Sequence, residues 1–412
     1  MYKQIYIFIF VTYLWQLNAQ TEIKLMSYNL LHFPTGTSYD RTADLRYIID
    51  SYQPDIFMVC ELESETGSDM ILNNCLNYSS DKYNGASFIE NTSSMYRDLQ
   101  QMLYYNKQMF EMTYQTLVVT PIRDINHYTL KMRTENQSTQ PIYIEVYVAH
   151  LKASGGTNNE QTRLDMVNEF TNDLQNIPSG HYVIFAGDFN LYSASEPAYQ
   201  EIIDNSNAIV MKDPVNSPGS WHNNYDYRIL HTQATHSQSN STFVGGGIDD
   251  RFDFIMLSEN MFNNPELQYI DNSYKSYGNN GNCFNKAITN SDCDSAEYDF
   301  NLRSHLYNMS DHLPVTLSLE TDQSIILGMQ HNELSSTYRI IPNPVQHSFS
   351  IHGKENEILA IDIFNSTGQR VMVIPAYHSF AKIDTNSLSP GMYFIRIQKE
   401  NQSQTIKFVK TD

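Results

Sequence analysis

Basic residues are scarce in this chain. Lys and Arg together number 26 against 46 Asp and Glu, so the formal net charge is −20. From Thr321 onward there are eight basic and eight acidic residues, and the acidic excess therefore lies before that position. This distribution disfavours a protein that holds nucleic acid tightly through a basic surface. It is compatible with an enzyme that contacts a polyanion transiently at a metal-loaded cleft.

Long apolar segments are also missing. A membrane-spanning helix needs roughly 20 apolar residues, and the apolar run at residues 5–15 is shorter than that. Lys3 precedes this run and Ala19 follows it, an arrangement typical of a secretory signal peptide. We expect residues 1–19 to be such a peptide rather than a membrane anchor, and we expect no stable membrane insertion.

Cysteine is rare, with four in the chain. In an exported protein Cys283 and Cys293, which bracket a polar stretch, are suited to a disulfide. Cys60 is either a buried thiol or a partner of Cys75. No set of Cys and His has the spacing of a zinc finger.

From residue 21 to about residue 320, short apolar runs that end in a polar residue alternate with helical patterns. The runs cover residues 23–28, 56–60, 142–149, 182–186, 251–257 and 313–319. Residues 42–50 and 160–174 have apolar positions at helical spacing. This alternation predicts an α/β layered domain, and the chain is long enough for a second, smaller domain.

Two stretches, residues 213–247 and 263–303, have the composition of long loops. Trp221 and His222 in the first loop either form a stacking surface for a base or belong to a local apolar cluster, and we favour the cluster. We expect residues 321–336 to form a linker. Beyond it, short alternating apolar and polar runs predict a small all-β sandwich over residues 337–412.

The polar residues that follow the runs are of types that bind phosphate or metal. Asp188 and Asn190, two apart after a buried run, point to the same side and can hold a water and a phosphate oxygen. Asp311 and His312 place a metal ligand beside a proton donor, and Glu61 is a hard oxygen ligand. Each of these motifs alone also has a common structural explanation, such as a turn, a cap or a surface carboxylate.

Six motifs together are far more specific than any one of them. They are Met26-Ser27-Tyr28-Asn29-Leu30, Val59-Cys60-Glu61-Leu62, Ala149-His150-Leu151-Lys152, Gly187-Asp188-Phe189-Asn190, Arg251-Phe252-Asp253-Phe254-Ile255 and Ser310-Asp311-His312-Leu313-Pro314-Val315. In this order, at the ends of predicted strands, the set resembles the endonuclease/exonuclease/phosphatase superfamily. That superfamily includes DNase I-like nucleases, bacterial sphingomyelinases and inositol-polyphosphate phosphatases.

The resemblance implies a fold and a metal site. The fold is a four-layer αββα sandwich over residues 20–320, with two mixed sheets face to face and helices outside. Glu61 would be the principal ligand of Mg²⁺, with Asn29 and Asp311 near the ion. Mn²⁺ or Ca²⁺ are alternatives, because oxygen ligands serve all three ions. Several relatives carry a carboxylate two residues after the first-strand Asn, whereas this chain has Leu31, so we expect one metal centred on Glu61.

The resemblance also implies catalytic roles. Asp188 and Asn190 would position the attacking water and the phosphoryl group. His312 would contact the phosphate or serve as the base, and Asp253 would orient its imidazole. A histidine at His150 is similar to the DNase I and sphingomyelinase branches. Which histidine acts as acid and which as base stays open.

The tail carries a second resemblance. Ile341-Pro342-Asn343-Pro344-Val345, Leu388-Ser389-Pro390-Gly391-Met392-Tyr393-Phe394 and Lys407-Phe408-Val409-Lys410 resemble the motifs of a type IX secretion sorting domain. An adhesive or carbohydrate-binding β-module is the alternative. The resemblance implies contact with the secretion machinery, export through the periplasm to the cell surface or the medium, and no part for the tail in catalysis.

The sequence as a whole predicts a secreted, Mg²⁺-dependent phosphodiester hydrolase, first of all an extracellular nuclease that uses in-line attack by water. We expect it to bind nucleic acid or another phosphodiester only transiently and to be a monomer. A phospholipid or phosphoinositide phosphoesterase is the alternative among hydrolases. A non-catalytic binding module on the same fold is the alternative outside them.

Overall fold

The computed structural model describes residues 20–93, 99–326, 338–352, 358–399 and 402–411. The expected signal peptide, residues 1–19, and residues 327–336 of the expected linker lie outside the described residues. The chain forms two compact units, residues 1–327 and residues 328–412. No helix among the described residues is long and apolar enough to cross a membrane.

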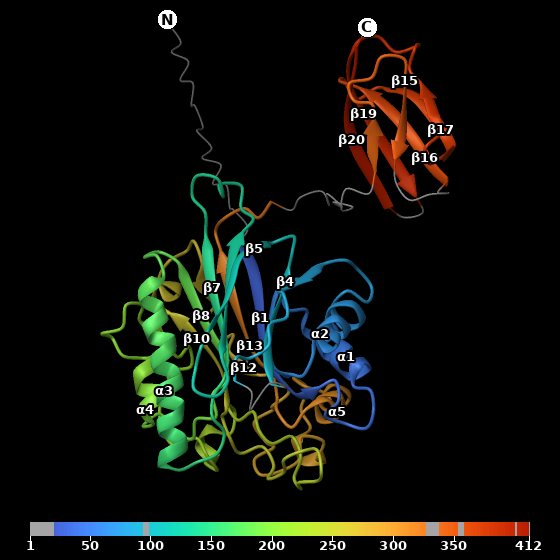
Figure 1. Ribbon diagram of the computed structural model, residues 1–412. Coiled ribbons are helices and arrows are strands. Elements are labelled where there is room, and N and C mark those ends of the chain that lie inside the picture. Colours follow the sequence, from blue (N-terminus) through green and yellow to red (C-terminus); the bar gives the residue numbers. More distant parts are fainter. Residues whose placement is uncertain (1–19, 94–98, 327–337, 353–357, 400–401, 412) are drawn as a thin grey trace, which may run out of the picture. The chain divides into compact units, whose positions relative to one another are not determined.

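The first unit contains two β-sheets that pack face to face (Figure 1). One sheet consists of β1 (Thr21–Phe33), β2 (Ile56–Leu62), β3 (Tyr83–Gly85), β4 (Gln100–Asn106), β11 (Gln268–Tyr269), β12 (Lys275–Ser276) and β13 (Val315–Thr321). The other consists of β5 (Phe110–Val118), β6 (Ile125–Met132), β7 (Tyr143–His150), β8 (Tyr182–Asp188), β9 (Met211–Lys212) and β10 (Asp253–Ser258). Each sheet is mixed, since β1–β2 and β7–β8 are parallel and the other pairs are antiparallel.

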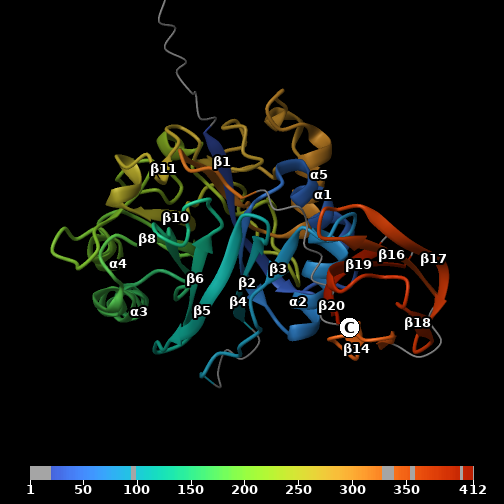
Figure 2. The same cartoon turned by 90° about the horizontal axis from the view of Figure 1, so that it is seen from above.

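Helices cover the outer face of each sheet (Figures 1 and 2). On one side lie α3 (Thr157–Asp173) and α4 (Pro197–Ile202), and on the other lie α1 (Thr42–Tyr52), α2 (Glu65–Met70) and α5 (Phe300–Met309). Shorter helical turns complete the set: η1 (Ile71–Leu76), η2 (Leu174–Asn176), η3 (Tyr225–Tyr227), η4 (Glu259–Phe262) and η5 (Ser291–Cys293). This arrangement confirms the predicted four-layer αββα sandwich.

Strand β7 shows why the apolar runs are continuous rather than alternating. Its side chains Ile144, Val146 and Val148 belong to the core between the two sheets. Tyr147 and Ala149 point the other way and pack with α3 in a second core. Because successive side chains of a strand face opposite sides, a sheet buried on both faces needs apolar residues at nearly every position.

The long loops pack against the sheets and end near the carboxyl ends of the parallel strands. Trp221 is fully buried and its indole Nε1–H donates to the carbonyl of Ser217 at 2.9 Å, which confirms the packing interpretation for this residue. Cys283 and Cys293 form a disulfide in the second loop. Cys60 and Cys75 are buried free thiols.

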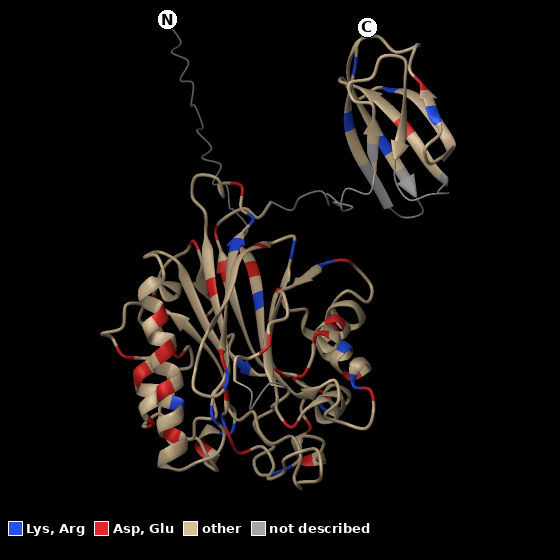
Figure 3. Ribbon diagram, viewed as in Figure 1, with Lys and Arg blue, Asp and Glu red and all other residues tan. Residues whose placement is uncertain are grey.

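Acidic residues are spread over the helices and strands of the first unit (Figure 3). Helix α3 illustrates this, since it carries Glu160, Asp165, Glu169 and Asp173 against a single Arg163. Arg163 is itself fully buried and pairs with Glu196 at 2.7 Å. The exposed charge of this helix is therefore negative.

The second unit is a separate two-sheet β-sandwich. One sheet has the order β14 (Arg339–Ile341), β15 (Ser348–His352), β18 (Lys382–Asp384), and the other has the order β17 (Arg370–His378), β16 (Ile358–Asn365), β19 (Gly391–Lys399), β20 (Gln402–Lys410). Its core includes Phe349, Ile361, Ile395 and Phe408. The all-β tail that the alternating pattern predicts is therefore present.

Candidate active site

Two pairs of parallel strands bring their carboxyl ends to one edge of the sandwich. Asn29 in β1 lies beside Cys60 in β2, directly before Glu61, and His150 in β7 lies beside Asp188 in β8. The amide of Asn29 donates from Nδ2 to Glu61 Oε1 at 3.0 Å and to Asp188 Oδ2 at 3.1 Å. A single buried amide thus joins the polar ends of the two sheets.

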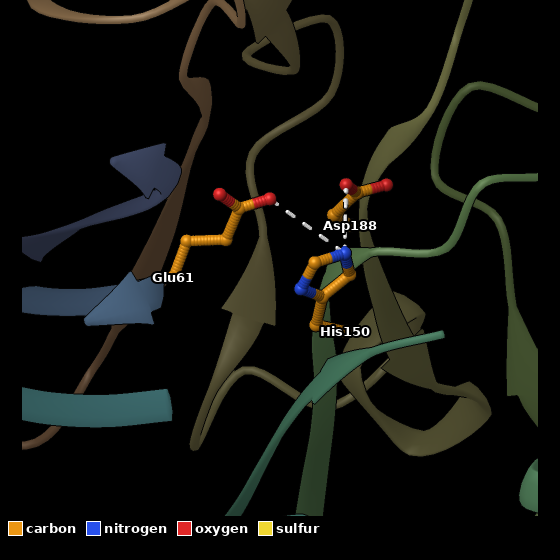
Figure 4. Close-up of side chains that lie close together, drawn as sticks. All are labelled: Glu61, His150 and Asp188. Atoms are coloured by element: carbon orange, nitrogen blue, oxygen red, sulfur yellow. Dashed lines mark ion pairs between the residues drawn. The ribbon is translucent and has the colours of Figure 1, made fainter. Parts of the chain in front are cut away.

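The close approach of β7 and β8 depends on Gly187. Its φ of +138° lies in the region that favours glycine, and a Cβ there would lie 1.9 Å from the carbonyl oxygen of Ala149. With no side chain in the way, His150 Nε2 comes to 3.5 Å from Asp188 Oδ2 and 3.8 Å from Glu61 Oε1 (Figure 4). Ligand atoms of these three buried residues all lie within 4.8 Å of one another.

His312 faces the same carboxylate from the opposite side. Its Nδ1 lies 2.7 Å from Asp253 Oδ2, and its Nε2 lies 3.7 Å from Asp188 Oδ2. Asp253 begins β10 directly opposite Asp188 in the antiparallel register. Thr232 also donates to Asp253 Oδ2, at 2.7 Å, so the carboxylate that orients the imidazole is itself fixed.

Burial and neighbouring charge act in opposite directions on His312. Burial alone would lower the pKa of His312, but the carboxylates of Asp253 and Asp188 raise it well above its ordinary value. Burial, together with the charges of Asp253 and Glu61, raises the pKa of Asp188 to about 7, against the opposing effect of His312. The pair therefore holds a proton between them, and His312 is the cationic partner.

His150 differs from His312 in its surroundings. Burial lowers the pKa of His150 well below its ordinary value, and the nearby cations Arg123 and His312 lower it further. Arg123 donates from Nε to the carbonyl of His150 at 2.8 Å. The two imidazoles of the site thus differ in charge, with His150 neutral.

Asn190 turns back onto Asp188. Its backbone N–H and its Nδ2 donate to Asp188 Oδ1 at 3.1 and 2.8 Å, and its φ is +52°. Glu61 has a φ of +58°. Left-handed conformations of non-glycine residues are costly and gather at functional sites, where surrounding contacts maintain them.

Asp311 has an oxygen that no hydrogen bond satisfies. The backbone N–H of Val244 donates to Asp311 Oδ2 at 3.1 Å, whereas Oδ1 is buried without a partner among the described residues. Ser310 beside it donates to the carbonyl of Asn29 at 2.7 Å, which ties this turn to β1. A buried carboxylate oxygen without a hydrogen bond fits a divalent cation, since such ions take oxygen and imidazole donors.

The structure brings together all eight residues singled out in the sequence: Asn29, Glu61, His150, Asp188, Asn190, Asp253, Asp311 and His312. Each is buried. Their roles as catalytic groups and ligands remain predictions.

Gln233 is a further member of the site that the sequence did not indicate. Its Nε2 lies 2.8 Å from His312 Nε2 and 3.5 Å from Asp311 Oδ2. It belongs to the first long loop, whose irregular sequence gives no periodic signal. The sequence signal for Gln233 is limited to its position in a long loop, and long loops often carry functional residues.

Arg41 is the second residue that sequence reasoning missed. It is fully buried and its guanidinium donates to the carbonyls of Leu30, Leu31, His32 and Met309, at 2.6 to 3.3 Å. It thereby links the irregular stretch of β1 after Asn29 to the segment before Asp311. Nothing in the local sequence distinguishes it from the exposed arginines.

A search of curated proteins finds no match to this chain. Solved structures similar to it include D. rerio TDP2 humanized by 14 mutations, with 16% identity over 73% of this chain and 99% of that one and a TM-score of 0.46. The human Nocturnin catalytic domain with bound sulfate has 18% identity over 72% and 93%, with a TM-score of 0.45. The endonuclease/exonuclease/phosphatase from Bacteroides vulgatus has 14% identity over 73% and 99%, with a TM-score of 0.45.

The second unit has a family match of its own. Residues 339–411 match the family model of the secretion system C-terminal sorting domain. The match confirms what the three tail motifs predict. These residues are a sorting domain that directs the chain to export by type IX secretion.

Proposed function

We propose that this chain is a secreted, divalent-metal-dependent phosphodiester hydrolase, and specifically an extracellular nuclease. One observation carries the proposal: Asp188 lies within 3.7 Å of both a neutral and a cationic imidazole, and the amide of Asn29 bonds it to the same hydrogen-bond network as Glu61. Phosphodiester hydrolysis needs an activated water, cations around the phosphate and a fixed geometry. The sorting domain supports an extracellular place of action.

In this proposal Glu61, Asp311 and Asn29 hold the ion, with the unsatisfied Asp311 Oδ1 as one ligand. When bound, a divalent ion neutralises phosphate charge and stabilises the leaving alkoxide. Asp188 Oδ2 takes the proton of the attacking water, because a carboxyl whose pKa is about 7 is suited to that transfer. Asn190 keeps Asp188 in place through its two hydrogen bonds.

The two histidines have different tasks. His312, cationic and oriented by Asp253, donates from Nε2 to a non-bridging phosphoryl oxygen. The side-chain amide of Gln233 lies 2.8 Å from that nitrogen, and beside a cationic imidazole it presents its oxygen, whose place the substrate oxygen takes. His150 stays neutral, and its Nε2 lies next to Glu61 and Asp188, where it can form a hydrogen bond with the substrate or with water. The transition-state charge is thus balanced by side chains whose positions are already fixed.

Exposed apolar side chains of the first long loop favour a second candidate, a phospholipid phosphoesterase. Val244, whose backbone contacts Asp311, has 51% of its surface exposed, and Ile229 on the same long loop is 59% exposed. These side chains could contact acyl chains at a membrane surface. Trp221, by contrast, is buried and gives this candidate no support.

A substrate panel tests both candidates. Purified protein is incubated with single- and double-stranded DNA, RNA, sphingomyelin vesicles and bis-p-nitrophenyl phosphate, with Mg²⁺, Mn²⁺, Ca²⁺ or EDTA. We expect EDTA-sensitive cleavage of a nucleic acid that Glu61→Gln abolishes. Glu22→Gln, an exposed carboxylate at the opposite end of the same sheet, should leave cleavage intact.

Three results would change the assignment. Cleavage of sphingomyelin vesicles without cleavage of DNA or RNA would favour the phospholipid phosphoesterase. Metal binding without hydrolysis of any substrate would favour a non-catalytic binding module. Cleavage that persists in EDTA would remove the metal from the proposal.

A further inference from the structure

His32 lies on the outer side of Glu61, away from His150. Its Nε2 is 3.6 Å from Glu61 Oε2, and its backbone N–H donates to the same oxygen at 3.2 Å. The other oxygen of Glu61, Oε1, faces Asn29 and His150. Glu61 therefore has one oxygen directed at the inner cluster and one directed at an imidazole that is 41% exposed.

The second nitrogen of His32 faces another carboxylate. Its Nδ1 lies 3.5 Å from Glu63 Oε1, and Glu63 is held in turn by the backbone and side chain of Thr35. A metal-binding histidine usually has a carboxylate on its non-ligating nitrogen, which fixes the ring and its tautomer. Glu61 and Glu63 give His32 this pattern: Nδ1 faces Glu63, and Nε2 faces Glu61 in the candidate site.

The irregular stretch of β1 that carries His32 is held in a costly conformation. Leu31 and His32 have φ values of +47° and +48°. Arg41 binds the carbonyls of both residues, and the backbone N–H of Gly36 donates to the His32 carbonyl at 2.6 Å. Two consecutive left-handed non-glycine residues require such support. The stretch interrupts the register of β1 with β2 between Asn29 and Phe33, and irregularities of this kind often re-aim a side chain beside an active site.

Asp311 gives separate evidence that the candidate active site holds a ligand. Its Oδ1 is buried and unsatisfied among the described residues, and Arg41 joins the Met309 carbonyl, just before it, to the stretch of His32. Two ligands of one ion at about 2.1 Å lie roughly 3 Å apart when they meet at a right angle. The 3.6 Å between His32 Nε2 and Glu61 Oε2 needs only a small rotation of an exposed side chain to reach that separation.

We propose that His32 is a further ligand of the cation and gives the site a preference for Mn²⁺ over Mg²⁺. This inference rests on the metal site of the proposed function and identifies a residue that tunes it. Imidazole nitrogen binds transition-metal ions better than Mg²⁺, which prefers oxygen. Leu31, where a carboxylate would supply oxygen instead, is 8% exposed.

The test measures metal binding directly. Full-length protein freed of metal is titrated calorimetrically with MnCl₂ and with MgCl₂, as wild type, His32→Ala, His32→Asp and His305→Ala. His305 is the matched control, because it is also a partly exposed histidine paired with a carboxylate, Asp44, at 2.7 Å. Thermal melts of the metal-free variants establish that they are folded, and the ¹⁴N coupling of bound Mn²⁺ is read by pulsed electron paramagnetic resonance.

We expect His32→Ala to weaken Mn²⁺ binding by about 10-fold or more and Mg²⁺ binding by a smaller factor. One set of ¹⁴N couplings should disappear, and His305→Ala should match the wild type. The ratio of the Mg²⁺ affinity to the Mn²⁺ affinity should be higher for His32→Asp than for the wild type. This variant keeps the proposal testable if His32→Ala fails to fold. Equal losses of both ions, or no loss of either, would overturn the proposal.

These outcomes are separable from those of the proposed function. If Mn²⁺ affinity depends on His32 but no phosphoester is hydrolysed, His32 remains a ligand and the hydrolase assignment fails. If hydrolysis is metal-dependent and His32→Ala leaves the Mn²⁺ to Mg²⁺ affinity ratio unchanged, the hydrolase stands and His32 is only a partner of Glu61 and Glu63.

Discussion

At the scale of single residues, Asp253 controls the state of His312. Its carboxylate raises the pKa of that histidine and fixes Nδ1 at 2.7 Å. Asp253→Asn removes the charge and keeps the shape, so we expect kcat to fall about 10- to 100-fold with little change in KM. The pKa of His312 should fall, because the negative charge of Asp253 no longer stabilises the imidazolium. The limb of the pH–rate profile that reports His312 should therefore move to lower pH.

Steady-state kinetics on bis-p-nitrophenyl phosphate between pH 5 and 9 check this expectation. Asp204→Asn, at an exposed loop carboxylate, provides the control and should behave as the wild type. An Asp253→Asn enzyme with unchanged kcat and an unchanged pH profile would show that His312 needs no carboxylate.

Residues at strand ends could be predicted from the sequence, and residues in loops could not. Glu61 and His150 follow apolar runs, and strand ends of parallel pairs meet at one edge of a sheet. Gln233 and Arg41 reach the site through loop conformation and tertiary contacts. Their positions depend on how distant segments pack, which no local pattern reports.

At the scale of elements, the approach of β7 to β8 rests on Gly187. A methyl group there would overlap the Ala149 carbonyl, and an L-residue would be strained at a φ of +138°. We expect Gly187→Ala to lower the free energy of unfolding by about 3 kcal/mol or more. Thermal or urea denaturation measures the loss.

Gly155→Ala is the matched control for this substitution. The nearest atoms to a Cβ at Gly155 belong to Tyr192 at 3.9 Å, so there is room for the methyl group. Its effect should stay within about 0.5 kcal/mol. Equal stability of the two variants would mean that β7 and β8 can separate without cost.

On the outer face of the same sheet, β6, β7 and the start of β8 share a buried carboxylate. Glu145 accepts from Thr129 at 2.6 Å and lies 2.8 Å from His127 Nε2 and 2.6 Å from His181 Nδ1. Burial alone would raise the pKa of Glu145, but these hydrogen bonds hold it below its ordinary value. The pKa of Glu145 is lower in the folded protein than in the unfolded chain. This carboxylate therefore stabilises the fold at pH values above its unfolded pKa.

The stabilisation is lost as the pH falls from about 4.5 through the lower folded pKa. We expect Glu145→Gln to cost roughly 1.5–3 kcal/mol at pH 7, where hydrogen bonds to a charged group are lost. The difference between the two proteins should narrow below pH 4.5. Urea denaturation from pH 7 to pH 3 measures it, and a difference that does not change with pH would contradict the assignment.

Some elements left little trace in the sequence. Most residues of strand β5 are exposed or half-buried, and β6 carries Asn126, His127 and Thr129 among its apolar residues. Neither forms the continuous apolar run by which β7 and β8 are found. Buried polar residues that form hydrogen bonds with one another give a strand the same composition as a loop. The sequence alone does not identify these partners, so such a strand cannot be distinguished from a loop.

At the scale of the whole molecule, the candidate active site and the sorting domain belong to different units. All eight predicted site residues lie before residue 327, and the sorting domain lies beyond residue 338. We expect a chain truncated after residue 326 to keep the kcat and KM of the full-length protein. In a host with type IX secretion, the same truncation should retain the enzyme inside the cell.

Kinetics of the two purified proteins and assays of culture medium check this separation. A full-length chain carrying Glu61→Gln is the control, since it should be exported normally without activity. Loss of activity in the truncated protein, with its fold intact, would give the tail a part in the reaction.

The pairing of β1 with β13 determines where this protein can be attached to a support or to another protein. Thr21 lies beside Thr321 in that register, and Ser27 beside Val315, so the unit begins and finishes at one corner. Asn29 is eight residues along β1 from that corner, roughly 26 Å at the rise of an extended strand. A support, a fluorophore or a fused protein joined at either of these positions is therefore anchored at the back of the molecule. An immobilised form would keep the candidate active site on the side away from the support.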